Sequence, residues 1–251
     1  MNAGFVVATA CLGTLAVGHS ALGEWKILGP LLRSDLPGFT LGATFAKRVL
    51  RFAWHLTSIA WIALAACLWV APASAAIVGA GMLVSSVVTL VGARGRHFAW
   101  ALFAAGGLGA LHRYQDGPAP TWLAYIGAAT AAALALLHVA WALGVTWGLE
   151  ASIPNTNGRR RFEPGPAAAL AVAVALAVLA IVFLGLGGVV TMPGVSWLAL
   201  AAAIVFCART IGDFRHFGLF GHGRGDAFSR NDAMLYTPLC FALAASLMWL
   251  R

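Results

Sequence analysis

Residues 97–112, HFAWALFAAGGLGALH, decide the topology of this chain because they form the shortest of its apolar runs. A helix that crosses a membrane needs about 20 mostly apolar residues, and this run is somewhat shorter. If the run crosses, the chain has eight spans. If it is instead a re-entrant or surface helix, every later loop changes side. The distribution of basic residues distinguishes these two alternatives.

The rest of the chain is also strongly apolar. Of its 251 residues, 61% are hydrophobic and only 10% are charged, whereas soluble domains carry about 25% charged residues. This composition predicts an all-α fold, a polytopic transmembrane helix bundle with eight spans. Asn231 and Asp232 are expected to cap the last span. We place the spans at residues 3–22, 49–71, 74–92, 97–112, 121–148, 166–190, 194–211 and 232–250.

The basic residues divide unequally between the two sides of these spans. With eight crossings, fourteen of the sixteen Lys and Arg residues lie on one side; without a crossing at 97–112, the division is nine against seven. The positive-inside rule makes the richer side cytoplasmic. We therefore expect a bacterial inner (plasma) membrane protein with both termini outside. Only Arg113 and Arg251 lie on the outer side.

The net charge of +8 bears on the partners of the chain. We interpret it as arginines at helix ends that meet an anionic leaflet. The lipid bilayer, and not nucleic acid, is therefore the predicted partner. Gly144 and Gly148 have the spacing of a helix-packing motif. We expect it to act within the bundle, and an oligomer is the alternative.

Two sequence features recur at the same interval. His19 and His138 are 119 residues apart, and so are the triplets Arg96-His97-Phe98 and Arg215-His216-Phe217. This interval raises the hypothesis of two parallel four-helix repeats, an N-terminal half at 1–116 and a C-terminal half at 117–251. Chance matching is the alternative explanation.

Histidines gather on the predicted cytoplasmic side, as six of the seven lie there. Ionisable groups at membrane depth are rare and often functional. No Asp or Glu lies in the middle of a span, so any proton coupling would fall to histidine. We predict a ligand pocket that is open to the cytoplasm, with purely structural residues as the alternative. Its predicted residues are His19, Glu24, Trp54, His55, His138 and Trp141.

The segment 209–232 is the richest in polar residues. Glycine-rich turns can hold anions through their backbone amides, and arginines would assist. We predict contacts to an anion or a lipid headgroup from Arg209, Asp213 and Arg215. A solvated, ion-paired loop is the alternative.

The C-terminal half carries a set of polar and glycine motifs: His138-x-x-Trp141-x-x-Gly144, Pro154, Arg209-x-x-Gly212-Asp213-Phe-Arg215, Asp232 and Tyr236-x-Pro238-Leu239. Through these residues the C-terminal half, roughly residues 124–251, resembles a bacterial membrane protein family that is catalogued only as a domain of unknown function. The N-terminal half is similar to a segment of longer members, through His19-Ser-x-x-Gly23-Glu24 and Arg51-Phe-x-Trp54-His55. The resemblance implies a membrane location but no reaction, substrate or cofactor.

Three functions are compatible with these patterns. The preferred hypothesis is binding or transport of a small molecule through the His/Trp-lined pocket. The first alternative is a membrane-embedded enzyme or redox protein with a His-ligated metal or haem, which would have to assemble from separate helices because no local ligand spacing occurs. The second alternative is a non-catalytic assembly partner.

Overall fold

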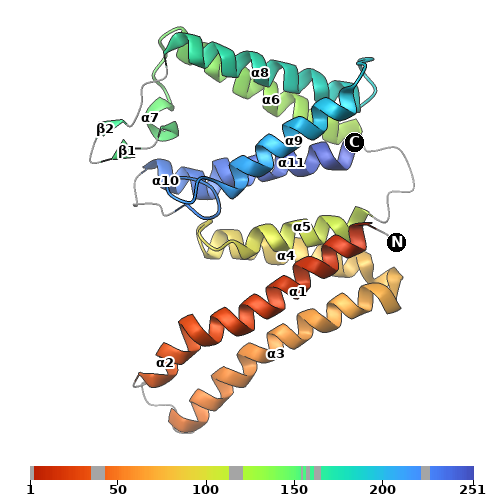
Figure 1. Cartoon of the computed structure of the whole chain (residues 1–251), viewed down its shortest axis with the longest axis vertical. Helices are drawn as coiled ribbons and strands as arrows, with labels where there is room; N and C mark the ends of the chain where they lie inside the picture. Colours follow the sequence, from red (N-terminus) through yellow and green to blue (C-terminus); the bar gives the residue numbers. More distant parts are fainter. Residues whose placement is uncertain are drawn as a thin grey trace. The chain divides into compact units, whose positions relative to one another are not determined.

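The described residues of the chain are almost entirely helical, as Figure 1 shows. They form two compact units: unit 1 contains Met1–Val88 and Ala99–Asp116, and unit 2 contains Thr89–Phe98 and Gly117–Arg251. That the two units are repeats of one another stays a prediction. The computed structural model describes residues 3–34, 43–112, 121–153, 155–156, 159–160, 165–221 and 227–251.

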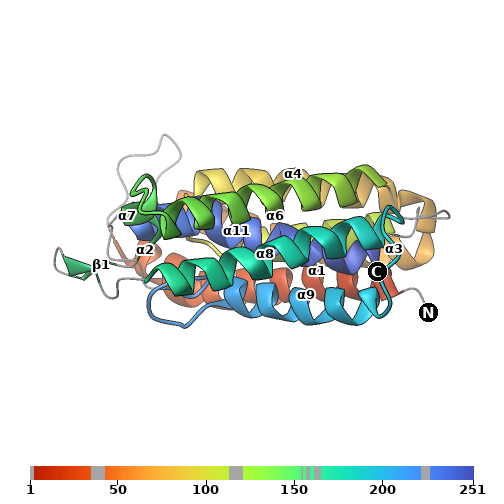
Figure 2. The same cartoon turned by 90° about the horizontal axis from the view of Figure 1, so that it is seen from above.

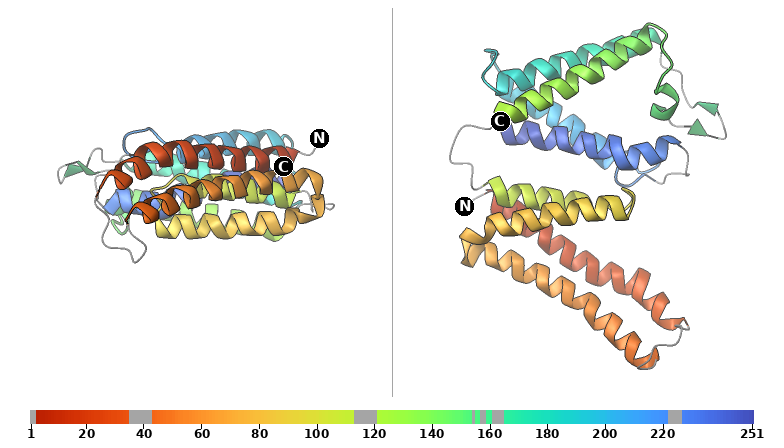
Figure 3. Two further views of the ribbon diagram at one scale, coloured as in Figure 1. Left: turned by 90° about the horizontal axis from the view of Figure 1, so that it is seen from below. Right: turned by 180° about the vertical axis from the view of Figure 1, so that it is seen from behind.

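In unit 1, the first helix packs against two others. Helix α1 contacts both α3 and α5, and the long pair α1 and α3 can be followed in Figures 1 and 3. The core between the helices includes Phe5, Leu12, Leu68, Met82 and Phe103. The elements are α1 (Ala3–Gly23), η1 (Glu24–Leu28), α2 (Gly29–Arg33), α3 (Ala43–Val70), η2 (Pro72–Ser74), α4 (Ala75–Gly92), whose end from Thr89 belongs to unit 2, and α5 (Ala99–His112).

In unit 2, the long helices pack chiefly in pairs. Helix α6 lies along α8, and α9 lies along α11, as Figures 1 and 2 show. Phe183, Leu243 and Leu247 are central in the core. The elements are α6 (Thr121–Ala142), α7 (Leu149–Ser152), an antiparallel pair of short strands β1 (Asn155–Thr156) and β2 (Arg159–Arg160), α8 (Pro166–Leu186), α9 (Val195–Ile211), α10 (Ala227–Asn231), η3 (Asp232–Tyr236) and α11 (Thr237–Leu250).

The structure confirms a helical chain with many apolar segments. Among the described residues, six helices are long and apolar enough to cross a membrane, and two shorter apolar helices, α5 and α9, accompany them. Helix α5 is the stretch that decides the topology. That α5 and α9 also cross, giving eight spans, stays a prediction.

Two details of the predicted spans are wrong. The fifth span ends at Ala142 because Gly144 (φ 93°) and Gly148 (φ 74°) adopt left-handed conformations. These glycines therefore lie in a turn and not on a packing face. Asn231 and Asp232 do not cap the last span, because the helix already begins at Ala227 and continues through both residues. The Asp232 carboxylate bonds elsewhere in unit 2.

Small side chains fill many of the helix contacts. Ala8, Ala75, Ala124 and Ala199 are fully buried, whereas many large apolar side chains outside the two cores face outward. Small residues allow helices in lipid to approach closely, while lipid tails solvate the bulky side chains. The most exposed large side chains include Val70, Ile77, Leu136 and Leu143.

The contact between α6 and α8 provides a test of this packing. A Cβ atom at Gly127 would lie 2.4 Å from the ring of the buried Phe183. We expect Gly127→Val to lower the stability by about 1–3 kcal/mol, because it overpacks the contact. The apparent melting temperature of the purified protein in detergent measures this effect.

Gly81→Val in α4 is the matched control, since nothing lies within 4 Å of a Cβ at that position. Valine and glycine differ by only a few tenths of a kcal/mol in helix propensity. Equal melting temperatures for the two variants would contradict the packing at Gly127.

Candidate functional site

A π-helical turn marks the polar region of unit 1. Such turns are rare in proteins, and those that occur often lie at functional sites. Helix α1 passes directly into η1, whose first residue is Glu24. The Glu24 carboxylate faces α3, where Oε1 accepts a 2.7 Å hydrogen bond from Arg51 and Oε2 lies 3.3 Å from Nε2 of His55. Glu24 therefore connects α3 to the end of α1.

From His55, hydrogen bonds continue between the two helices. Nδ1 of His55 lies 2.9 Å from the hydroxyl of Ser20, which in turn donates a 2.9 Å bond to the hydroxyl of Ser58. The Ser58 hydroxyl lies 3.2 Å from Nδ1 of His19. We call Glu24, His55, Ser20, Ser58 and His19 the polar chain of unit 1.

Aromatic side chains hold the inner end of the polar chain. The His19 ring stacks on Trp54, with centroids 4.4 Å apart and planes 9° apart, and meets the edge of Trp61 at 4.9 Å. The Trp54 indole N–H donates a 2.8 Å bond to the carbonyl of His19. A Cβ atom at Gly23 would lie 2.2 Å from that indole nitrogen, so this approach requires glycine.

A cavity of about 550 Å³ lies at the outer end of the polar chain. Its described lining carries four basic side chains and one carboxylate, so its electrostatic character is positive. Glu24 and its partner Arg51 both line the cavity, and Glu24 also contacts His55. The lining residues are Glu24, Trp25, Gly29, Leu32, Arg33, Thr44, Lys47, Arg48 and Arg51.

Four of the six predicted pocket residues thus lie together in unit 1: His19, Glu24, Trp54 and His55. Sequence reasoning missed Ser20 and Ser58 as site residues. Helical spacing could have indicated Ser58, since Arg51, His55 and Ser58 follow the i, i+4, i+7 pattern of one helix face.

The other two predicted pocket residues lie in unit 2 and bond within their own segment. Nδ1 of His138 is 2.8 Å from the carbonyl of Leu134, and the Trp141 indole donates to the carbonyl of Trp147. The two rings meet edge to face at 4.7 Å. A pocket that joins them to the polar chain of unit 1 stays a prediction.

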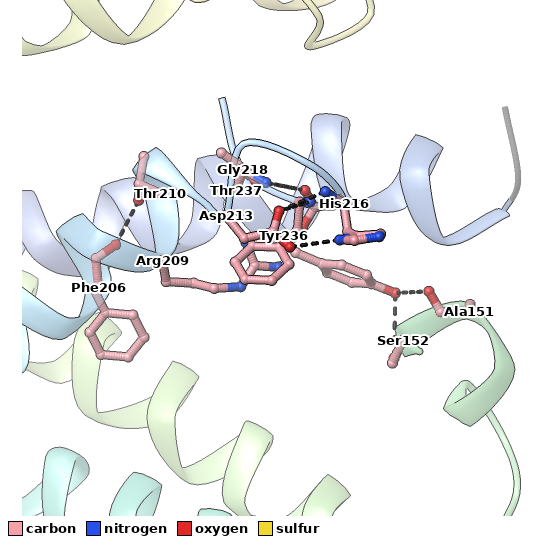
Figure 4. Close-up of polar contacts among 12 residues, drawn as sticks. Ala151, Ser152, Phe206, Arg209, Thr210, Asp213, His216, Gly218, Tyr236 and Thr237 are labelled. Atoms are coloured by element: carbon pink, nitrogen blue, oxygen red, sulfur yellow. Dashed lines mark hydrogen bonds and ion pairs between the residues drawn. The ribbon is translucent and has the colours of Figure 1, made fainter. Parts of the chain in front are cut away.

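A second π-helical turn, η3, introduces the buried carboxylate of Asp232 in unit 2. Figure 4 shows the polar contacts around Arg209, Gly218 and Thr237. Arg209 forms an ion pair with Asp232 Oδ1, and its guanidinium lies over the Phe217 ring. Asp232 Oδ2 accepts bonds from the backbone N–H of Gly218 at 2.7 Å and the hydroxyl of Thr237 at 3.1 Å. Arg209 is therefore bound to a carboxylate of its own unit.

Asp213 organises the segment that follows α9. Its Oδ1 accepts bonds from the backbone N–H groups of Arg215, His216 and Phe217, and its Oδ2 lies 2.7 Å from Nδ1 of His216. Burial raises the pKa of the Asp213 carboxyl, but these donors outweigh that effect and hold the pKa well below its usual value. Phe214 has a φ of 59°, an uncommon conformation for a bulky residue.

Unit 2 has a smaller cavity, of about 220 Å³, beside this segment. Its lining includes Arg96, His216 and Asp232, so one residue from each Arg-His-Phe triplet lies at the same cavity. Arg215, one of the three predicted anion contacts, is not among the lining residues. Contact of Arg209, Asp213 and Arg215 with an anion or headgroup stays a prediction.

No group of three or more His, Cys, Asp or Glu side chains converges on a metal-sized site within the described ranges. The described ionisable groups meet instead as pairs and chains. Their arrangement suits hydrogen bonding, charge pairing and proton exchange.

Part of unit 2 matches a known protein family. Residues 131–247 match the model of a family described as Protein of unknown function (DUF3995). The resemblance of the C-terminal half to a family of unknown function is therefore confirmed over these residues. No curated protein and no solved structure matches the chain.

Because of the hydrogen bonds to Asp213, we expect the stability of the folded chain to depend on pH. Because its pKa is lower in the folded chain than the ordinary value of about 3.9, its stabilisation is present at neutral pH and is lost as the pH falls below about 4. We expect Asp213→Asn to lower the melting temperature at pH 7, and the gap to the wild type to narrow in acid. A gap of constant size between pH 7 and pH 3 would contradict this assignment.

Proposed function

We propose that this chain is a multi-pass membrane protein that binds a small anionic molecule in the basic cavity of unit 1. The observation that carries the proposal is the composition of the cavity wall. Arg33, Lys47, Arg48 and Arg51 line it together with a single described carboxylate, Glu24. Arginine and lysine side chains are the usual partners of phosphate and carboxylate groups.

The volume of the cavity supports a small molecule as the ligand. About 550 Å³ falls within the range of ligand pockets, about 300–1,000 Å³. The exposed Trp25 adds an apolar surface to the wall, and Thr44 adds a hydroxyl. A molecule with one anionic group and a compact apolar or polar body fits this lining.

The polar chain gives the cavity a second property. Arg51 bonds to Glu24, and Glu24 also contacts His55. An anion that draws Arg51 away from Glu24 would change the electrostatic potential at the His55 ring. Binding in the cavity is therefore coupled electrostatically to the interior of unit 1. We further propose that the ligand moves across the membrane. His138 and Trp141 of unit 2 are then candidate contacts along its path.

The proposal places the cavity on the cytoplasmic side of a bacterial inner membrane. Its four basic residues belong to the set that the positive-inside rule assigns to the cytoplasm. With eight crossings, both termini are outside.

Anion binding can be tested by thermal stability in phosphatidylcholine nanodiscs. Potassium phosphate should raise the melting temperature above that in potassium chloride of equal ionic strength, since a ligand of the folded state stabilises it by RT ln(1 + [L]/Kd). Lys47→Gln and Arg48→Gln should each reduce this shift, because each removes a positive charge from the cavity wall.

Arg251→Gln serves as the control, since it removes an exposed arginine that does not line the cavity. Phosphate also strengthens apolar burial in proteins generally. A phosphate shift of the same size in all three variants and the wild type is therefore nonspecific and overturns the proposed site.

The proposed topology can be tested with reporter fusions. A fusion after residue 116 should show alkaline phosphatase activity outside, and a fusion after residue 160 should show green fluorescence in the cytoplasm. The first fusion reports whether the short helix α5 crosses. A cytoplasmic residue 116, or an external residue 160, would disprove the eight-span arrangement.

A further inference from the structure

We propose that His55, Ser20, Ser58 and His19 form a proton relay between the Glu24 edge of the basic cavity and the interior of unit 1. The relay needs no ligand in the cavity, so it goes beyond the proposed binding function and stands or falls separately. It assigns a role to two serines that were not among the predicted pocket residues.

The four side chains form an unbroken path. The successive contacts measure 2.9 Å from His55 to Ser20, 2.9 Å from Ser20 to Ser58, and 3.2 Å from Ser58 to His19. A hydroxyl can donate one hydrogen bond while it accepts another, and a neutral imidazole has one donor and one acceptor nitrogen. Every member can therefore receive a proton on one side and release one on the other.

The Glu24 carboxylate determines which nitrogen of His55 carries hydrogen before the protons shift. An ionised carboxylate only accepts hydrogen bonds, so Nε2 of His55 carries the hydrogen that faces it. When His55 is an imidazolium, Nδ1–H donates to Ser20, Ser20 donates to Ser58, and Ser58 donates to Nδ1 of His19. This direction agrees with the bond from Ser20 to Ser58.

One shift of three protons then moves the charge. The Nδ1 proton of His55 passes to Ser20, the hydroxyl proton of Ser20 passes to Ser58, and that of Ser58 passes to Nδ1 of His19. His55 becomes neutral and keeps its Nε2–H, each serine again has one hydrogen, and His19, which began with hydrogen on Nε2, becomes the imidazolium. Three N–H or O–H bonds break and three form, and one positive charge moves from His55 to His19.

Both ends of the path can hold this charge. At His55, the Glu24 carboxylate lies 3.3 Å away and is itself shared with Arg51. At His19, the Trp54 ring stacks face to face and Trp61 adds an edge. An imidazolium over an aromatic face gains a cation–π attraction. Ser58, which is buried, lies between the two half-buried rings.

Proton exchange of the His19 ring tests the relay. The full-length protein is labelled with ¹⁵N-histidine and reconstituted in phosphatidylcholine bilayers with chloride buffer. His19→Gln and His55→Gln assign the two rings. Solid-state NMR then measures the exchange rate of the His19 Nδ1–H with water under conditions in which the ring carries hydrogen on both nitrogens. We expect Ser58→Ala to slow this exchange at least tenfold and Ser58→Thr, which keeps the hydroxyl, to restore it to within about twofold.

Ser86→Ala is the matched control. Ser86 is a buried serine of the same unit whose hydroxyl donates to the carbonyl of Trp100, away from the polar chain. It should leave the His19 exchange unchanged. If Ser58→Ala does not fold, Ser20→Ala interrupts the same path one step earlier and should give the same slowing.

Two results overturn the relay. Unchanged exchange in Ser58→Ala or Ser20→Ala shows that protons reach His19 by another path. Equal slowing in Ser58→Ala and Ser58→Thr shows that packing, and not the hydroxyl, controls the exchange. Neither result depends on phosphate binding. If the serine variants slow the exchange as expected but phosphate gives no specific shift in melting temperature, the relay stands and only the proposed anion binding is overturned.

Discussion

A polar side chain in a lipid-facing helix must find its partners within the protein, because the bilayer core offers no water to replace them. This constraint explains the arrangement of the two acidic residues at the π-helical turns. Glu24 contacts Arg51 and His55, while Asp232 contacts Arg209, Gly218 and Thr237. In each case a carboxylate at the start of a π-helical turn forms an ion pair with an arginine from another helix.

The two carboxylates differ in exposure, and this difference separates their roles. Asp232 is almost fully buried and contacts residues of unit 2, where it connects Arg209 of α9 and the backbone of Gly218 to η3. Glu24 is more than a third exposed and lines a basic cavity. Its contacts are therefore accessible from that cavity, whereas those of Asp232 are enclosed.

Much of the fold could be predicted from composition and spacing. Long apolar runs bounded by prolines and glycines locate the helices, because the bilayer requires length and apolarity that can be counted. The ends of the helices were less predictable. The fifth span stops at Ala142 because two glycines take left-handed conformations, and the last begins before Asp232 because that carboxylate bonds across unit 2 instead of capping its own helix.

The sequence by itself determined that the chain is helical and apolar enough for a membrane, since these conclusions depend on residue type and order alone. It also indicated His19, Glu24, Trp54 and His55. Only the tertiary structure decided that Ser20 and Ser58 connect the two histidines, and that Arg209 binds Asp232. Hydrogen bonds depend on distances of about 3 Å between groups on different helices, and no pattern along one helix specifies how its neighbour is rotated.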